Sequence, residues 1–472
     1  MSVLDRLRAL LPKNACLSGP AQLLVYECDA LTHFRTRPLA VVFPASTEDV
    51  QSIVRICRDE GVPFTPRGAG TGLSGGATPA EGGVLIELSR MNRVLSIDAE
   101  SRLAVVQPGL INAHLSDAAR PYGLHYAPDP SSQTACSLGG NVAENAGGPH
   151  GLKYGSTERH VLAVKAVLSD GRVVMLGHPT GTSHGLDLRG LFLGSEGTLG
   201  IATELVVRLT PNPEVTETLL APFRTLRPAC EAVSTLIREG ISAAAIEALD
   251  DRTIAAVEAS VFRAGYPTDA GAVLLIEFDG TEEDVGESVA RTRALLEAAG
   301  AMSISSTRDP EQRKVLWRGR KGAFGAMGRL APDLYVQDAV VPRTKLPEVL
   351  EKVCAICDAH GLRLANVFHA GDGNLHPNIS YDGRDPDEVE RVVRAGREII
   401  EACLAVGGSL SGEHGIGLEK QEFMPLLFND DDLDAMKRVR DVFDPTRLMN
   451  PGKVIPTPRA CTETRPPKAV GT

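Results

Sequence analysis

Two histidines, His369 and His376, flank the glycine-rich sequence AGDGNL, and both are residue types that bind metal ions. Asp372-Gly373 within it predicts a two-residue β-hairpin loop, because both positions accept positive φ. Counting outward from that loop places His369 opposite His376, with Cβ atoms about 4.5–5.5 Å apart. Asn378 follows two residues later and points to the same face of the strand. The pattern predicts two imidazoles and an amide oxygen at one point; the alternative is a pair of surface histidines.

A second pair of polar residues, Glu413 and His414, is bracketed by glycines in the sequence SGEHGIG. Neighbours in an extended chain point in opposite directions, so Glu413 can complete a metal shell while His414 faces another reactant. Two imidazoles, an amide and a carboxylate suit zinc, manganese or iron(II) and are unusual for calcium. We therefore predict a metal site formed by His369, His376, Asn378 and Glu413. The alternative for the second stretch is a glycine-rich loop with a capping glutamate.

Three glycine-dense loops precede these residues in the chain. PRGAGTGLSGG, residues 66–76, has five glycines in eleven positions, a density that suits backbone N–H groups approaching a phosphate. Arg67, Thr71 and Ser74 add polar donors to this loop. It lacks both the Walker A lysine and the acidic residue of the dinucleotide fingerprint. Because residues 128–148 and 194–201 are similar in composition, we predict one extended, phosphate-bearing cofactor that touches all three loops; flexible turns are the alternative.

The composition is that of a globular chain, with 43% hydrophobic and 23% charged residues in a length of 472, enough for two to four domains. A formal charge of −11 without a basic block argues against nucleic acid as a partner. Nine scattered cysteines and an N-terminus without a cleavage pattern indicate a cytoplasmic protein. No apolar run reaches the roughly 18 residues of a transmembrane segment. Cys354 and Cys357 lie at helical spacing without a second pair, so we expect no iron–sulfur cluster in this chain.

The pattern of apolar runs predicts an α+β protein with a boundary at the proline-rich sequence TPNPEV. We expect a first domain over residues 1–215, with a helix from Ser46 to Gly61 and a tight hairpin at Asp170-Gly171. A second domain over 216–420 carries the predicted metal site on a half-exposed antiparallel sheet with helices on one face. Residues 421–472 form a C-terminal segment whose tail, from Thr457, is expected to be frayed.

Six motifs, in the same order, resemble a known flavoprotein family. RGAGTGLSGG, YAPDPSSQTACSLGGNVAENAGG, LKYGST, GSEGTLG, NVFHAGDGNLHP and SGEHGIG are similar to the vanillyl-alcohol oxidase family, in its branch of FAD-linked D-2-hydroxy-acid dehydrogenases. The likeness covers residues 26–456, and the second motif is the most specific. It implies a two-lobed FAD-binding domain of the vanillyl-alcohol oxidase type, an α+β cap domain with an antiparallel sheet, and a C-terminal segment that returns to the FAD domain.

The resemblance also implies a set of FAD-binding residues. Because the first loop has no histidine for covalent attachment, noncovalent FAD is expected. The pyrophosphate is assigned to Arg67, Gly68, Gly70, Thr71, Gly72, Ser74 and Gly75. The ribityl chain and flavin are assigned to Pro128, Gly139, Gly140, Asn141, Asn145, Gly147, Gly148, Tyr154 and Gly155, and the nucleotide end to Glu196, Gly197 and Ile201.

The activity implied by the resemblance is oxidation of a small 2-hydroxy acid, with hydride transfer to flavin N5. His414 matches the base of relatives, and Arg320 matches the arginine that binds the substrate carboxylate with its planar fork. Relatives acting on dicarboxylates carry a lysine that is missing between Leu334 and Pro342, so a small monocarboxylate, glycolate or D-lactate, is favoured over 2-hydroxyglutarate. Oxidation of glycolate to glyoxylate is the activity we expect first.

Electrons are expected to pass to an iron–sulfur partner subunit or to quinone, beside a further flavin-domain subunit, in a complex at the inner membrane. A D-lactate dehydrogenase working without partner subunits is the alternative activity. A metal hydrolase and a non-catalytic flavin-binding subunit are alternatives from other classes.

Overall fold

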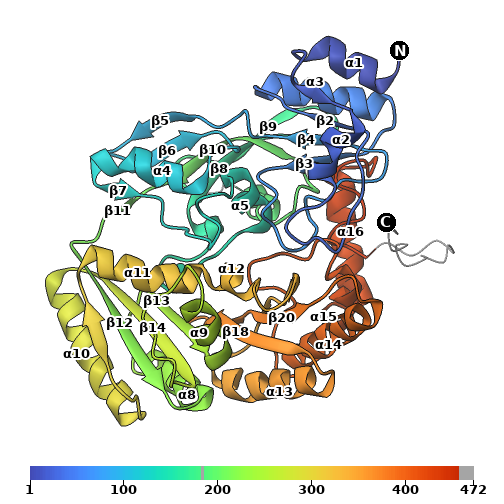
Figure 1. Cartoon of the computed structure of the whole chain (residues 1–472). Coiled ribbons are helices and arrows are strands. Elements are labelled where there is room, and N and C mark those ends of the chain that lie inside the picture. Colours follow the sequence, from blue (N-terminus) through green and yellow to red (C-terminus); the bar gives the residue numbers. More distant parts are fainter. Residues whose placement is uncertain (182–184, 457–472) are drawn as a thin grey trace.

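The strands of the described chain, residues 1–181 and 185–456 of a computed structural model, form four sheets in an α+β arrangement. Two smaller lobes built from the N-terminal half lie above a larger sheet that begins at β12 (Figure 1). The tail from Thr457, for which we expected fraying, lies outside the described residues. No helix in the described ranges is long and apolar enough to cross a membrane.

The first lobe is a four-stranded sheet in the order β1-β2-β4-β3, in which β2 and β3 run parallel to β4. The helix predicted from Ser46 to Gly61 is confirmed as α3: the Ser46 hydroxyl accepts the N–H of Asp49, and Gly61 follows the helix at φ +65°. Apolar side chains of α3 pack on the strands because they recur on one helix face. The elements are α1 (Val3–Leu10), β1 (Cys16–Leu17), α2 (Pro20–Leu23), β2 (Ala40–Val42), α3 (Thr47–Asp59), β3 (Phe64–Arg67) and β4 (Val84–Glu87).

The second lobe is an antiparallel five-stranded sheet in the order β5-β6-β10-β8-β9. The predicted hairpin at Asp170-Gly171 joins β8 to β9, and Gly171 adopts φ +78° there. The elements are β5 (Val94–Asp98), β6 (Leu103–Val106), α4 (Asn112–Ala119), β7 (Leu124–His125), α5 (Leu138–Glu144), α6 (Gly151–Tyr154), β8 (Val161–Val167), β9 (Val173–Gly177), α7 (Leu188–Phe192), β10 (Ile201–Arg208) and β11 (Thr210–Pro211), the last pairing with β7.

The larger sheet has nine strands and follows the path β15-β12-β14-β13-β18-β19-β17, with β20 beside β18 and β16 beside β20. All neighbouring strands of this sheet are antiparallel. The strands are β12 (Val215–Phe223), β13 (Ala245–Asp250), β14 (Ala272–Gly280), β15 (Ser305–Thr307), β16 (Asp333–Val336), β17 (Ala339–Val340), β18 (Arg363–His369), β19 (Asn374–Leu375) and β20 (Pro377–Tyr381).

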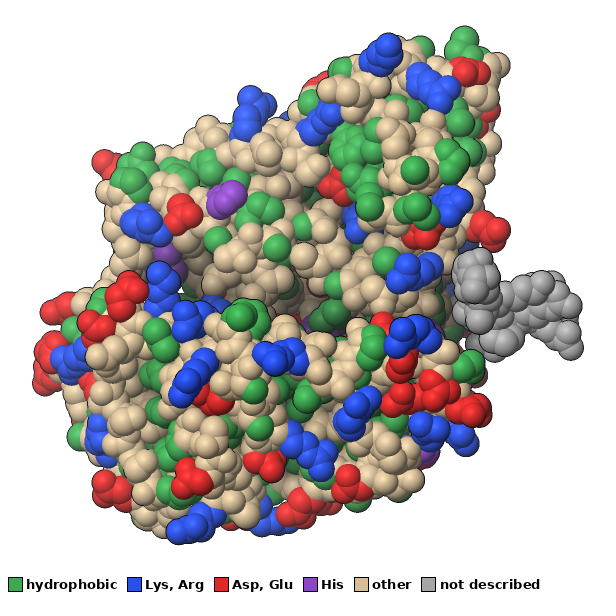
Figure 2. Space-filling model, viewed as in Figure 1, with side chains coloured by type: hydrophobic (Ala, Val, Ile, Leu, Met, Phe, Trp, Pro, Cys, Tyr) green, Lys and Arg blue, Asp and Glu red, His purple; other side chains and the backbone are tan. Residues whose placement is uncertain are grey.

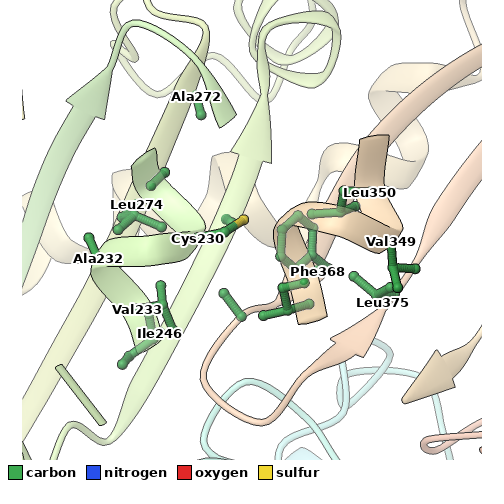
Figure 3. Close-up of a cluster of buried hydrophobic side chains, with 14 of the residues drawn as sticks. Cys230, Ala232, Val233, Ile246, Ala272, Leu274, Val349, Leu350, Phe368 and Leu375 are labelled. Atoms are coloured by element: carbon green, nitrogen blue, oxygen red, sulfur yellow. The ribbon is translucent and has the colours of Figure 1, made fainter. Parts of the chain in front are cut away.

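The expectation of a half-exposed sheet with helices on one face is wrong, because helices cover both faces. Ile246 of β13 packs in a core with residues of α8 and α13 (Figure 3), to which Ala248, α10 and α14 also contribute. Ala245 and Leu249 pack into a second core with α9, α11 and α12. Apolar residues at alternate positions on both sides of β13 make a two-sided burial favourable. The helices are α8 (Leu226–Arg238), α9 (Asp251–Glu258), α10 (Glu282–Ala298), α11 (Pro310–Lys321), α12 (Ala323–Met327), α13 (Leu346–Ala359) and α14 (Pro386–Leu404).

The hairpin between the two predicted metal histidines has a longer connection than expected. His369 pairs with Asn374, not with His376, so the two-residue loop at Asp372-Gly373 is wrong and four residues connect the strands. The Asp372 carboxylate accepts the N–H of Asn374 at 3.1 Å, and the Gly373 carbonyl accepts the N–H of Val341 at 3.0 Å. Both bonds stabilise the longer turn. The first is local, whereas the bond to Val341 joins residues distant in the chain and could not be predicted from the turn sequence.

The C-terminal residues cross back to the first lobe. After α15 (Met424–Leu427), helix α16 (Asp430–Phe443) runs upward beside this lobe in Figure 1. Met449 then bridges to Phe64 in parallel and joins the core of the first lobe. The Asn450 side chain donates to the carbonyls of Gly76 and Glu196. The exact division into 1–215, 216–420 and 421–472 stays a prediction.

Candidate active site

A cavity of about 370 Å³ lies where the three glycine-dense loops meet the larger sheet. It follows the seam between the two N-terminal lobes (the upper half) and the larger sheet with its helices (the lower half), which Figure 2 shows as a hollow. Arg320, Lys321 and Phe324 line it from α11 and α12, and His376, Glu413 and His414 line it near Arg320, whose Nη2 lies 3.5 Å from Nδ1 of His369. The cavity therefore connects the predicted phosphate-binding loops with the predicted metal ligands.

The first glycine-dense loop closes over its own arginine. Gly70 adopts φ +70°, and a Cβ there would lie 2.1 Å from Nη2 of Arg67, so only glycine fits. The Arg67 guanidinium donates to the carbonyl of Cys28 at 2.7 Å and lies 3.7 Å from the Glu87 carboxylate. Arg67 thus supports the loop from within the lobe, and it lines the cavity together with the backbone of the loop.

The structure brings most of the predicted cofactor residues to the cavity wall. Those lining it are Arg67, Gly68, Gly70, Thr71, Gly72, Gly139, Gly140, Asn141, Glu196, Gly197 and Ile201. The remaining predicted residues do not line the cavity and make contacts inside the protein. These are Ser74, Gly75, Pro128, Asn145, Gly147, Gly148, Tyr154 and Gly155: for example, Asn145 bonds Glu158, Tyr154 donates to Asp279 at 2.6 Å, and the Ser74 carbonyl accepts the N–H of Leu418.

His369, His376 and Glu413 form a buried cluster beside the cavity. Nε2 of His369 lies 3.1 Å, and Nε2 of His376 3.2 Å, from the same oxygen of Glu413. Ligand atoms about 2.0–2.2 Å from a common ion lie roughly 3.0–3.4 Å apart, so these three atoms fit one ion. Burial opposes ionisation of Glu413, but the neighbouring His369 outweighs it and holds the pKa of the carboxyl well below its usual range. Two imidazoles and an ionised carboxylate are a ligand set for zinc, manganese or iron(II).

The predicted fourth ligand, Asn378, is fully buried in β20. Its Nδ2 donates to the carbonyl of His376 at 2.6 Å, which ties the two residues together. The side-chain oxygen of Asn378, the atom that would bind an ion, has no hydrogen-bond partner. That oxygen is thus free to act as a ligand, although the structure gives it no direct contact with the other three.

Glu247 of β13 stands behind this cluster and was missed by sequence reasoning. One of its oxygens lies 2.7 Å from Nδ1 of His369, and the other accepts Nε of Arg320 at 2.6 Å and Nη2 at 2.5 Å. Arg320 is only 1% exposed and lines the cavity, and its Nη1 is buried without a hydrogen-bond partner. The fork edge of Arg320 is occupied by Glu247, so only the end of the guanidinium is available to a ligand. A lone acid in the apolar sequence AAIEAL was the available signal, because a buried carboxylate requires partners.

Asp338 holds the loop that carries Glu413 and His414 and was also missed. Its carboxylate accepts the hydroxyl of Ser411 at 2.6 Å and the backbone N–H of His414 at 3.0 Å, and it lies 3.4 Å from the Lys420 ammonium. Burial opposes ionisation of Asp338, but Lys420 and the nearby imidazoles keep its pKa well below the usual range. Asp338, His376 and His414 also form a second set of ligand-type atoms within 4.8 Å of one another. The single acid in the largely apolar sequence YVQDAVV was the signal for this role.

His414 stacks on His376 with ring centroids 5.0 Å apart and an interplanar angle of 11°. Burial lowers the pKa of His414 to about 4, although Asp338 acts in the opposite direction. Its Nδ1 is buried without a hydrogen-bond partner. A neutral imidazole with a free nitrogen therefore lies beside the three-residue cluster and at the cavity wall.

A second buried charge cluster joins the upper half of the molecule to α11. His150 lies 2.9 Å from the carboxylate of Asp129 and 3.0 Å from that of Glu277, and its ring packs against Trp317. Trp317 donates Nε1 to Glu277 at 2.6 Å, and Lys321 lies 3.2 Å from Asp129. Burial alone would lower the pKa of His150, but the two carboxylates outweigh it and raise that pKa to about 10. This cluster fixes α11, and with it Arg320, against the upper half.

Comparison with known proteins agrees with this arrangement of loops and cavity. The model of the FAD binding domain matches residues 38–177, and that of the C-terminal domain of FAD linked oxidases matches residues 212–454. The chain is 47% identical to the glycolate oxidase subunit GlcD of Escherichia coli (strain K12) over 462 residues, 98% of this chain and 92% of the relative. The chain belongs to the FAD-linked oxidases. As a member of this family it is an FAD-dependent oxidoreductase.

Other relatives of this FAD-linked oxidase differ in the substrates that their names give. A D-lactate dehydrogenase of Anaerostipes hadrus is 32% identical over 460 residues, 96% of this chain and 97% of the relative. The solved structure of p-cresol methylhydroxylase shares the fold with a TM-score of 0.83 at 18% identity, covering 96% of each chain. The predicted family resemblance and the fold of the vanillyl-alcohol oxidase type are thereby confirmed.

Proposed function

We propose that this FAD-linked oxidase oxidises a small 2-hydroxy monocarboxylic acid, glycolate to glyoxylate in the first instance, with the help of a bound divalent metal ion. The observation that carries the proposal is the convergence, in one cavity, of an unpaired guanidinium end, a three-residue ligand cluster and a neutral imidazole. Relatives named as a glycolate oxidase subunit and a D-lactate dehydrogenase support this substrate class.

The residues along the upper cavity wall suit noncovalent FAD. The backbone of residues 68–72 offers N–H groups to the pyrophosphate, a role for which closely packed glycines are suited. The N–H groups of Gly139 and Gly140 are bonded to the Pro108 carbonyl and the Ser137 hydroxyl, so these two glycines contribute a close approach to the cofactor and not donors. The first loop has no histidine that could attach the cofactor. When bound, FAD supplies the acceptor for the hydride that leaves C2 of the substrate.

The ligand cluster suits a divalent ion held by His369, His376 and Glu413, with Asn378 as an additional ligand. Zinc, manganese and iron(II) all accept such ligands. When bound, the ion supplies Lewis acidity toward the hydroxyl and carboxylate oxygens of the substrate. The chain contributes the fixed geometry of the ligands, which Glu247 and Asp338 hold from behind.

Two side chains act directly on the substrate in this proposal. The free end of Arg320 binds the carboxylate, and the low polarity around this buried guanidinium strengthens that charge-assisted bond. His414, which lines the cavity as a neutral imidazole, takes the proton of the C2 hydroxyl. Phe324 and the apolar part of the wall exclude water from the same space.

The acceptor of the electrons is proposed to be an iron–sulfur partner subunit, leading to quinone, with a second flavin-domain subunit in the complex. A relative that is itself named a subunit supports an assembly with partner subunits. We place this assembly at the cytoplasmic side of the inner membrane as part of the proposal. No cysteine cluster of the described residues could hold an iron–sulfur centre. The second candidate function is a D-lactate dehydrogenase that acts without partner subunits, favoured by the relative of that name.

The test is anaerobic bleaching of the bound flavin by glycolate, D-lactate and 2-hydroxyglutarate, each with and without chelator. We expect bleaching by the two monocarboxylates, fastest with glycolate, and its loss after metal removal. Equal bleaching by 2-hydroxyglutarate, or full activity after complete metal removal, would contradict the proposal. His414→Asn should abolish bleaching, whereas a non-catalytic flavin carrier would tolerate that change.

A further inference from the structure

Glu247 is a carboxylate in the middle of β13 with no exposed surface. A buried carboxylate is costly unless it is paired and hydrogen-bonded. Here both oxygens are used: one bonds Nδ1 of His369, and the other bonds two nitrogens of Arg320. The two partners have different roles in the proposed function, since one faces the ion and the other faces the substrate carboxylate.

On the His369 side, Glu247 determines which ring nitrogen carries the hydrogen. A carboxylate accepts a bond from Nδ1–H, so the lone pair of a neutral His369 lies on Nε2, the nitrogen directed at Glu413. On the Arg320 side, Glu247 fills the edge formed by Nε and Nη2 and leaves Nη1 unpartnered. A carboxylate ligand can then approach only the end of the guanidinium.

We infer that Glu247 is a positioning residue shared by the metal ligand His369 and the substrate-binding Arg320, so that ion affinity and carboxylate affinity depend on one side chain. The inference rests on the proposed function and adds a physical coupling between its two binding steps. It also explains a preference for one carboxylate: Lys321, the other cation of α11 at the cavity wall, is paired with Asp129.

Glutamine cannot replace Glu247 in both roles. An amide has one acceptor and one donor group, so it must turn its NH2 toward either His369 or Arg320. Facing His369, the NH2 group moves the ring hydrogen to Nε2 and removes the lone pair from the ion. Facing Arg320, it places a donor against donors and leaves the buried guanidinium without its counter-charge. In either orientation one hydrogen bond to His369 or Arg320 is lost, and in both the negative charge beside Arg320 is gone.

The test uses the FAD-loaded full chain and the variants Glu247→Gln and Glu247→Asp. The matched control is Glu204→Gln. Glu204 lies on β10, is paired with Lys165 of β8, and does not line the cavity. Zinc affinity is measured by chelator competition without substrate. Carboxylate affinity is measured separately on metal-free protein, from the change in flavin absorbance as the inert carboxylate oxamate is added.

We expect Glu247→Gln to weaken zinc binding about 10- to 100-fold, with oxamate binding weakened at least about tenfold, whereas the control changes neither by more than about threefold. Oxamate binding that stays within threefold while zinc binding falls would overturn the shared role, as would unchanged values for both. If neither variant of Glu247 folds, Arg320→Lys decides: it should lower zinc affinity by releasing Glu247, and an unchanged zinc affinity overturns the inference. A wild type that binds no metal and bleaches with no 2-hydroxy acid would instead refute the proposed function.

Discussion

Replacing His150 by glutamine should change how the stability of the protein depends on pH. In the folded protein, two carboxylates raise the pKa of this buried imidazole to about 10, whereas a histidine in the unfolded chain titrates near 6.5. Between these values the folded state holds a proton that the unfolded state has released. Stability from His150 is therefore fully present below about pH 6.5 and is lost as the pH rises toward 10.

The expected slope follows from one proton. The free energy of unfolding should fall by about 1.4 kcal/mol per pH unit within this window through His150 alone. Between pH 7 and pH 9 the wild type should thus lose roughly 2–3 kcal/mol more than His150→Gln. Other groups that titrate in this range cancel in the comparison, provided that they behave alike in both proteins. The partner carboxylate of Glu277, whose pKa is lowered to about 2 mainly by His150 against the effect of burial, stays ionised throughout.

The assay is urea unfolding of both proteins at pH 7, 8 and 9 with the same excess of FAD. Trp317 is the single tryptophan of the sequence and packs against His150, so its fluorescence reports on this cluster. His114→Gln, on the exposed face of α4, is the control for the loss of a histidine. Parallel pH profiles for the wild type and His150→Gln would refute the reasoning, because they would show that His150 is not held protonated between the carboxylates.

Three further outcomes concern the active site. Arg320→Lys should raise KM for glycolate about 10- to 100-fold, because a lysine lacks the planar fork that bonds Glu247 along one edge and the substrate at its end. Lys321→Ala should change KM by less than about threefold, since the Lys321 ammonium is already paired with Asp129. Steady-state kinetics measure both values, and equal effects of the two substitutions would contradict the assignment. Glu413→Gln should lose the bound metal, measured by elemental analysis, and full metal occupancy would contradict its role. Asp338→Asn leaves the Lys420 ammonium buried without a counter-charge and should lower the free energy of unfolding, measured in urea, by about 3–5 kcal/mol. A decrease of less than about 1 kcal/mol would contradict this role of Asp338.

The hairpin near the metal ligands illustrates what a local pattern can and cannot predict. The dipeptide Asp372-Gly373 indicated a turn, and a turn is present, but the register differs because the loop has four residues. The shift moves each pairing by two positions, and side chains alternate with a period of two. His369 and His376 therefore still lie on one face, with ring centroids 5.1 Å apart. A shift by one residue would have separated them.

The residues that sequence reasoning missed share a physical property: their partners are remote in the chain. Glu247 lies 122 positions from His369, and Asp338 lies 76 positions from His414. Glu247 is the single acid within strand β13 before its last residue, Asp250, and Asp338 lies between β16 and β17 in a largely apolar stretch, so the sequence shows that each requires a partner but not which one. The two-sided burial of the larger sheet could not be predicted for the same reason. The helices that cover its two faces come from separate parts of the chain, and where they pack is set by the whole fold.

The loop of residues 411–417 shows why the site depends on the docking of the two halves. Glu196, from the upper half, accepts the N–H groups of Ile416 and Gly417 at 2.6 and 2.7 Å, while Asp338, from the larger sheet, accepts that of His414. The loop that carries the proposed metal ligand Glu413 and the proposed base His414 is thus held by one carboxylate from each half. Loss of either contact would displace Glu413 and His414 together, so metal binding and proton transfer should fail in parallel when the halves separate.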